Sequence, residues 1–245
     1  MSATSFRADW ALVRGAYRGA PWAVRAHALG RFLTCPLGRV ADLVPPGARL
    51  LDLGAGHGTL ARLAVARGAA RAVAVEPDAR KVLRGVRHPR VSFVAGYAEA
   101  VGGTFDAVAL VDVLYRVAPA AWDPLLALAR ERLVPGGLLL VKEIDPERPL
   151  KALWNRAQEH LADALGMTLG DAFHYETRDE MGARLARLGF ERCETIDLGA
   201  GYPHAHVVYV ARRPPGPMPG QARSAATTAA ARAVAARPAV SPGGQ

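Results

Sequence analysis

The middle of the chain alternates short apolar runs with helical patterns, and this alternation constrains the fold more than any other feature. The runs RLLDLG, RAVAVE, VSFVAG, FDAVALVDVL and LLLVKEI have the length of strands, and segments such as TLARLAVARG and AAWDPLLALARERL have helical periodicity. These runs are too continuously apolar for strands with one solvated face. They therefore predict a parallel sheet that is covered by helices on both faces.

The rhythm changes after Pro149. RPLKALWNRAQEHLADALG predicts a long helix, and TRDEMGARLARLGF predicts another, which begins with a capping box between Thr177 and Glu180 and ends at Gly189. The last two predicted strands, FERCETIDL and HVVYVARR, follow with no helix between them. We therefore expect them to pair antiparallel.

The two ends of the chain differ in character from its middle. Residues 1–45 predict a helical cap whose first helix is amphipathic and basic, with Phe6, Trp10, Val13 and Tyr17 on one face and Arg7, Arg14 and Arg18 interleaved. Such a helix packs over the edge of the domain, covers a substrate pocket, or contacts an anionic membrane surface. Residues 214–245 are rich in Pro, Gly and Ala and almost lack large apolar residues, so we expect a disordered tail.

Composition limits the choice of partners and compartment. The formal net charge is +9, but 28 of the 31 basic residues are arginine, a skew that weakens any inference from charge to nucleic acid. Cys35 and Cys193 match no metal or redox spacing and are interpreted as two buried free thiols in a reducing compartment. The N-terminus has no apolar stretch of signal-peptide type, and no run approaches the ~18–20 residues of a membrane span. We expect a soluble, cytoplasmic protein.

Three glycines follow the first predicted strand in RLLDLGAGHGTL, at Gly54, Gly56 and Gly58. Ligands of open α/β sheets bind at the carboxyl ends of strands, where bare main chain and a helix N-terminus are accessible. Glu76 ends the second strand, and an acid there can accept hydrogen bonds from both hydroxyls of a ribose. The two features together indicate a cofactor that contains a nucleoside.

The spacing of the glycines helps to identify this cofactor. It is G-x-G-x-G, whereas nicotinamide folds usually show G-x-G-x-x-G, and Asp52 precedes the first glycine by two residues. A carboxylate repels a pyrophosphate but attracts a cation. S-adenosylmethionine carries a sulfonium and an α-ammonium group, and it fits this pattern.

The successive motifs resemble those of class I S-adenosylmethionine-dependent methyltransferases. LLDLGAGHGTLA, VAVEPD, VSFVAGYAEA, FDAVALVDVLYRV and RLVPGGLLLVKE are similar to the family in order and spacing, from about Arg49 to Glu143. The resemblance implies a Rossmann-like sheet of seven strands, mostly parallel with an antiparallel last strand. It assigns the methyltransferase domain to residues 46–213, with a substrate-lid insertion over 146–203.

The resemblance also implies which residues bind the cofactor. Gly54 and Gly56 border its methionine portion, Asp52 acts on the ammonium group, and Glu76 takes the ribose hydroxyls. In the third motif Tyr97 stands where the family has Asp, so the contact to adenine falls to Ala98 or Glu99. The complete expected set is Asp52, Gly54, Ala55, Gly56, Glu76, Pro77, Tyr97, Ala98 and Asp112.

The acceptor side of the site is less defined. Methyl transfer needs a general base only if the nucleophile arrives protonated with a high pKa, so no catalytic residue is assigned. Tyr115, His174 and Tyr175 are candidates, and Arg116, Glu143 and Asp145 also follow strands. His204 and His206 alternate on the last strand, but no third ligand stands nearby, so no metal site is predicted.

The stretch VDVLYR lacks the Asn/Asp-Pro-Pro-Tyr/Phe element that many enzymes use to methylate amino groups of bases or of glutamine. This argues against that class of nucleic-acid or protein methylation. The sequence predicts methyl transfer to a small-molecule or lipid-like acceptor, at oxygen or carbon. An RNA methyltransferase, a non-catalytic protein that retains the fold, and a nicotinamide oxidoreductase remain as alternatives. The acceptor and the oligomeric state are not predicted.

Overall fold

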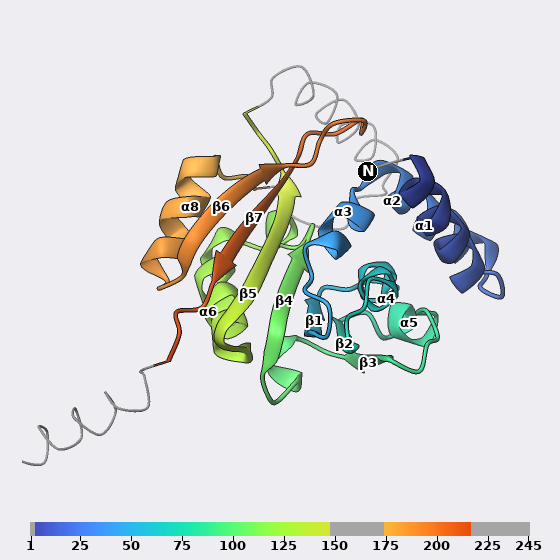
Figure 1. Ribbon diagram of the computed structural model, residues 1–245, viewed down its shortest axis with the longest axis horizontal. Helices are drawn as coiled ribbons and strands as arrows, with labels where there is room; N and C mark the ends of the chain where they lie inside the picture. The colour runs from blue at the N-terminus through green and yellow to red at the C-terminus, as the bar shows by residue number, and fades with distance from the viewer. Residues whose placement is uncertain (1–2, 148–173, 217–245) are drawn as a thin grey trace, which may run out of the picture. The chain divides into compact units, whose positions relative to one another are not determined.

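Seven strands form one sheet in the computed structural model of the protein, which describes residues 3–147 and 174–216 (Figure 1). Their order is β3-β2-β1-β4-β5-β7-β6. The strands are β1 (Arg49–Leu53), β2 (Arg71–Glu76), β3 (Val91–Ala95), β4 (Phe105–Val111), β5 (Leu133–Ile144), β6 (Glu191–Asp197) and β7 (His206–Arg212). β7 pairs antiparallel with both β5 and β6, and the other pairs are parallel. The predicted Rossmann-like sheet with an antiparallel last strand is confirmed.

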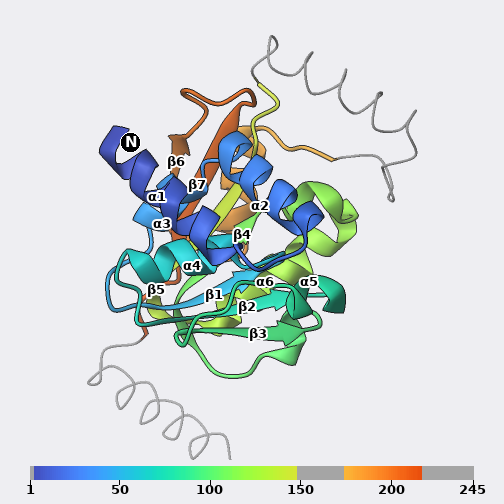
Figure 2. The same cartoon turned by 90° about the vertical axis from the view of Figure 1, so that its right-hand side faces the viewer.

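Helices cover both faces of this sheet. One face carries α1 (Ala3–Ala16), α2 (Trp22–Thr34), α3 (Leu37–Asp42) and α4 (Thr59–Ala66), and Figure 2 looks onto it. The other face carries α6 (Trp122–Arg132) and α8 (Arg178–Arg187), while the short α5 (Ala79–Leu83) contacts β2 and β3. Because side chains alternate along a strand, Leu50 packs in the first core and Leu51 in the second.

Several local predictions hold. α8 begins with the expected capping box, since the Thr177 side chain accepts from the Glu180 main chain and the Glu180 carboxylate accepts from the Thr177 main chain. Gly189 follows α8 with φ +79°. Three short 3-10 helices, η1 (Ala98–Ala100), η2 (Leu114–Arg116) and η3 (Pro119–Ala121), join the longer elements.

The N-terminal helices belong to the main core. Val13 of α1 and Tyr17, which directly follows this helix, are buried in the same cluster as the sheet, and the interleaved arginines Arg7, Arg14 and Arg18 are exposed. Asp9 is also buried and accepts two hydrogen bonds, at 2.7 and 2.8 Å, from Arg67, the residue that caps the C-terminus of α4. This paired charge fixes α1 to the helix that follows the glycine-rich turn.

The compact unit that contains the sheet extends from Met1 to Pro214. The predicted helix over 148–166 and most of the predicted disordered tail lie outside the described residues. Cys35 is buried, but Cys193 is exposed on β6, where side chains are solvated, so the prediction of two buried thiols is wrong for Cys193. Across residues 3–147 and 174–216, none of the helices has the length and apolar character needed to cross a membrane.

Candidate functional site

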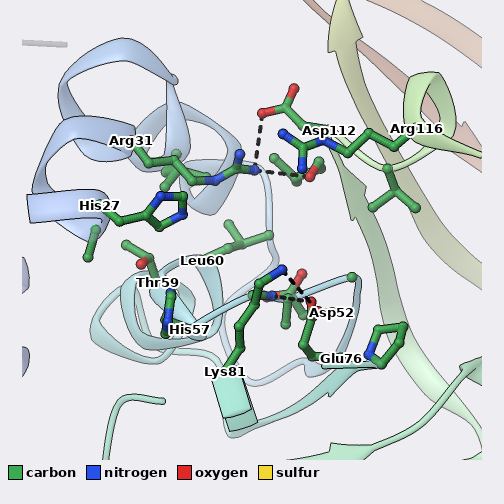
Figure 3. Close-up of a pocket in the computed structure, with 18 of the residues that line it drawn as sticks. His27, Arg31, Asp52, His57, Thr59, Leu60, Glu76, Lys81, Asp112 and Arg116 are labelled. Carbon is green, nitrogen blue, oxygen red and sulfur yellow. Dashed lines mark hydrogen bonds and ion pairs between the residues drawn. The ribbon is translucent and has the colours of Figure 1, made fainter. Parts of the chain in front are cut away.

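A cavity of about 220 Å³ opens at the carboxyl ends of β1, β2 and β4 (Figure 3). Seven of the nine residues expected at the cofactor line it: Asp52, Gly54, Ala55, Gly56, Glu76, Pro77 and Asp112. The other two do not. Tyr97 is 72% exposed, and Ala98 is buried in the core between the sheet and helices α6 and α8. The structure therefore places the third motif outside this cavity.

The glycine-rich turn has a backbone that requires glycine. Gly54, Gly56 and Gly58 all have positive φ, at +70°, +58° and +80°. A Cβ at Gly54 would lie 2.6 Å from Val113, and one at Gly58 would lie 2.4 Å from Phe93. A Cβ at Gly56 would meet no described protein atom within 4 Å. The turn is thus closely packed on either side of Gly56 and open at Gly56 itself.

Tyr17 holds this turn from the N-terminal helices. Its hydroxyl donates to the main-chain oxygen of His57 at 2.9 Å and lies 2.8 Å from the Thr59 hydroxyl. Burial raises the pKa of Tyr17 to about 12, so this hydroxyl stays protonated and remains a donor. The predicted apolar face of α1 therefore also positions the turn.

Asp52 and Glu76 are both buried at this cavity. Asp52 receives a backbone hydrogen bond from Ala61 in the first turn of α4, but its Oδ2 is buried and has no hydrogen-bond partner among the described residues. Burial raises the pKa of Asp52 to about 7. Asp52 therefore binds the first turn of α4 and leaves Oδ2 for a cation or a donor.

Glu76 is bound by three donors from the turn and from α5. Its Oε2 accepts from the Gly56 main chain at 2.9 Å, and its Oε1 accepts from the main chain of Asp78 at 3.2 Å and from Lys81 at 3.3 Å. These bonds fix the carboxylate at the rim of the cavity. Each carboxylate oxygen has two lone pairs, so Oε2 can still accept from a hydroxyl of a ligand, and Oε1 can do so if the ligand hydroxyl replaces the 3.3 Å contact with Lys81.

Asp112 lies at the end of β4 in a cluster of charges. It has φ +57°, a conformation that Asp tolerates better than most residues. Its carboxylate pairs with the fully buried Lys142 of β5 and with Arg31 of α2 at 3.1 Å, and the Cys35 thiol donates to it at 3.4 Å. Although burial opposes ionisation, Lys142 and Arg31 hold the pKa of Asp112 well below its usual range. Asp112 is thus held in place by protein partners.

Sequence reasoning missed the part of the site that α2 supplies. His27 and Arg31 are four residues apart and line the cavity together. The His27 ring lies 5.5 Å from the ring of His57, whose direction the sequence leaves open. Burial, Arg31 and Lys81 lower the pKa of His27, and burial, His27 and Lys81 lower the pKa of His57. The signal available in the sequence was the spacing of His27 and Arg31, which places both side chains on one face of an amphipathic helix.

Lys142 was missed as well. It is one of only three lysines in the chain and stands within the apolar run LLLVKEI. A lysine is almost never fully buried without a partner. Its position therefore signalled an acid nearby, but the sequence did not identify Asp112 as that acid.

A second cavity, of about 360 Å³, shares His27, Arg31 and Asp112 with the first. Its lining also includes Tyr115, His204 and His206. No group of three metal-binding side chains occurs within the described parts of the chain.

The candidate catalytic residues meet at a third cavity. Tyr115 stacks on Tyr175 at 5.9 Å between ring centroids, and the His174 main chain donates to the Tyr115 main chain at 3.3 Å. The cavity that all three line holds only about 10 Å³, which is about one water molecule. Of the three, Tyr115 alone also lines the second cavity.

The two acids after β5 have structural partners. Glu143 accepts from the main chains of Val113 and Leu114 at 3.2 and 2.9 Å, and burial raises its pKa to about 8. Asp145 is buried and pairs with Arg178 of α8 at 2.6 Å. These contacts fix η2 and α8 at the edge of the site.

Comparison with known proteins identifies a family. Residues 25–195, which are more than half of the chain, match a family described as a methyltransferase domain. The match includes α2 from Arg25 onward and every residue that lines the first cavity. No curated protein matches the sequence.

Solved structures share the fold. A putative methyltransferase of Haloferax volcanii, in complex with a methyltransferase activator, has a TM-score of 0.62 and 17% identity over 84% of this chain and 99% of that chain. Human N-acetylserotonin methyltransferase in complex with SAM has a TM-score of 0.59 and 20% identity over 83% and 59%. The 1,6-didemethyltoxoflavin-N1-methyltransferase of Burkholderia thailandensis has a TM-score of 0.54 and 18% identity over 86% and 88%. This chain thus spans about three fifths of the human enzyme.

Proposed function

This chain belongs to the methyltransferase domain family, and on that premise we propose that it transfers a methyl group from S-adenosylmethionine to a small-molecule or lipid-like acceptor, at oxygen or carbon. The observation that carries the proposal is the pair Asp52 and Glu76, which come from different strands and line one cavity. Asp52 offers a buried carboxylate oxygen with no described partner, and Glu76 offers a fixed carboxylate beside an open glycine turn.

The donor set fits the cofactor. We assign Asp52 to the ammonium group, the main chain of Gly54, Ala55 and Gly56 to the methionine portion, and Glu76 to the ribose hydroxyls. S-adenosylmethionine supplies an electrophilic methyl group on a sulfonium when it is bound. Asp112 and Arg31 form the wall that this cavity shares with the second cavity.

The chain's contribution to rate is positioning. Holding a nucleophile in line with a reactive carbon supplies a large part of a rate enhancement, on the order of several kcal/mol. No general base is assigned. His174 and Tyr175 line a cavity with room for little more than a water molecule, and the hydroxyl of Tyr115, which also lines the second cavity, accepts from Arg116 and has a pKa raised by burial. The named substrates of the human and Burkholderia enzymes are small molecules, which supports an acceptor of that size.

The surface of the N-terminal helices supports a second part of the proposal. Trp22 is 82% exposed, Leu33 is 48% exposed, and Arg7, Arg14 and Arg18 are exposed on α1 and in the turn that follows it. We infer that residues 1–45 act as a cap and also contact the cytoplasmic surface of an anionic membrane. A lipid-like acceptor would reside in that membrane. Sedimentation with anionic and neutral vesicles tests this. Equal binding of Trp22→Ala and wild-type protein to anionic vesicles contradicts it.

Calorimetry tests the cofactor assignment. S-adenosylmethionine and S-adenosylhomocysteine should bind and NAD should not. Binding of NAD without either adenosyl ligand would overturn the proposal. Glu76→Gln should weaken S-adenosylhomocysteine at least about tenfold, the loss expected for hydrogen bonds to a charged group. Glu191→Gln, a matched change on the exposed strand β6, should leave the affinity unchanged. A metabolite extract incubated with labelled methyl donor then identifies the acceptor.

A further inference from the structure

We propose that the second cavity is the acceptor subsite, and that His206 selects a neutral acceptor that donates an O–H or N–H hydrogen bond to its Nδ1. This inference rests on the proposed methyltransferase function and names the class of its substrate. The cavity of about 360 Å³ can hold a small ring compound.

The position of the second cavity suits an acceptor. It shares His27, Arg31 and Asp112 with the cofactor cavity, so the two cavities adjoin at these residues. Figure 3 shows the ion pair between Arg31 and Asp112. Methyl transfer requires the acceptor atom within contact distance of the methyl group. We therefore assign the acceptor to the second cavity, which borders the cofactor cavity at these three residues.

The hydrogen bond that His206 makes fixes its tautomer. Its Nε2 lies 2.7 Å from the main-chain oxygen of Thr34. Because a carbonyl oxygen only accepts, Nε2 must carry the proton, and Nδ1 is then a bare acceptor in the neutral ring. Nδ1 is buried and has no hydrogen-bond partner among the described residues. Any hydrogen bond between this ring and a cavity ligand must therefore be accepted at Nδ1.

Neighbouring rings hold His206 in this orientation. The residue is 3% exposed and faces Ile144 across the β5–β7 ladder. The rings of Tyr202 and His204 meet it edge-on at 5.6 and 5.9 Å. A buried acceptor in a fixed position costs free energy until a donor reaches it, so the ring discriminates between ligands with and without a donor.

The charges around the cavity exclude a cationic acceptor. Arg31 and Lys142 are cations, and Asp112 is the anion that they share. Burial and Lys142 lower the pKa of His206 to about 3, against opposing contributions from Asp112 and the Thr34 hydrogen bond, so the ring is neutral at physiological pH. The excess positive charge disfavours an ammonium ligand. An anionic group that carries no hydrogen has nothing to donate to Nδ1, so the remaining class is a neutral hydroxyl or N–H compound.

Two matched pairs of probes test the assignment: phenol with anisole, and indole with N-methylindole. Benzylamine serves as the cationic probe. Long-range ¹H–¹⁵N spectra of the histidine rings should report His206 as the neutral Nε2–H tautomer. Phenol or indole should change the ¹⁵N chemical shift of the His206 Nδ1. Each should also bind at least about fivefold tighter than its methylated partner, which is the gain expected from one neutral hydrogen bond.

His206→Gln provides the matched variant, because its amide can still donate to Thr34 while the Nδ1 acceptor is lost. It should abolish the preference for the donor probes. His88→Gln, remote from the cavity, should keep the preference. An Nδ1–H or charged ring at neutral pH, equal binding within both pairs, tighter binding of benzylamine, or no change in the Nδ1 chemical shift at millimolar probe would overturn the inference.

The spectra require no activity and no cofactor, and they also decide the matter if His206→Gln fails to fold. Calorimetry with S-adenosylhomocysteine is run separately on the same protein. A wild-type protein that binds phenol at His206 but no adenosyl ligand would contradict the proposed function alone. The converse result would contradict this inference alone.

Discussion

The guanidinium of Arg31 lies 3.1 Å from the carboxylate of Asp112, and this ion pair joins helix α2 to the carboxyl end of β4. The same Nη2 donates to the main-chain oxygen of Val111 at 3.1 Å. Because α2 lines both large cavities, the pair connects the N-terminal helices to the strand end where the two cavities meet.

Arg31→Leu should loosen α2 without unfolding the domain, since Lys142 still neutralises Asp112. The loss of hydrogen bonds to a charged group is expected to cost about 1.5–3 kcal/mol, or a fall in Tm of roughly 3–12 °C. Hydrogen exchange of the α2 amides should accelerate more than exchange in β4. Arg25→Leu, on the same helix but outside both cavity linings, is the control. Equal exchange in the two variants would rule out this role for Arg31.

Asp52 should make cofactor affinity depend on pH. Burial raises its pKa to about 7, whereas a cationic ligand group favours the ionised form. Binding at pH 6 therefore releases a proton. As the pH is raised toward 7, the affinity for S-adenosylhomocysteine should rise by up to about tenfold per pH unit, and above pH 7 it should level off. Calorimetry in two buffers of different ionisation enthalpy measures this release. Asp52→Asn should remove both the release and the slope between pH 6 and 8. If the pH dependence persists in Asp52→Asn, it comes from His27 or His57 and not from Asp52.

Two glycine substitutions should separate stability from binding. Gly58→Ala places a Cβ against the Phe93 ring at φ +80°, so unfolding should become easier by roughly 2–4 kcal/mol. In Gly56→Ala the added Cβ meets no described protein atom, so the only cost to stability is the strain of an alanine backbone at positive φ, about 1 kcal/mol. Its methyl group enters the cavity, so S-adenosylhomocysteine affinity should fall at least about tenfold. Urea unfolding and calorimetry on both variants check the contrast. A Gly56→Ala protein with wild-type affinity would show that the cofactor does not approach this turn.

The sequence was sufficient to predict the sheet and the cofactor side of the site. Both depend on local patterns, because apolar runs determine the strands, and glycines and acids at strand ends lie at one edge of a parallel sheet. Asp52, Gly56 and Glu76 reach one cavity for this reason. The antiparallel pairing of β6 with β7 also follows from two strands with no helix between them.

Contacts between distant segments could not be predicted in this way. Tyr17 reaches His57 and Thr59 across about 40 residues, and the Thr34 main chain meets His206 across 172. Such contacts depend on how α1 and α2 pack, which periodicity leaves open. The family motif led to the expectation of Tyr97 at the cofactor, yet its side chain is exposed, because η1 begins directly after it and turns Ala98 into the core instead.

Lys142 and Asp112 should be coupled in stability, since the buried ammonium and the carboxylate are in direct contact. Asp112→Asn keeps a side chain that tolerates φ +57° but leaves Lys142 buried without its anion, which should cost about 3–5 kcal/mol. Lys142→Met should cost less, because Arg31 still pairs with Asp112. The double variant should lose less than the sum of the two single variants by about 1–3 kcal/mol. Urea unfolding of all four proteins closes the cycle, and strict additivity would mean that Asp112 depends on Arg31 instead of Lys142.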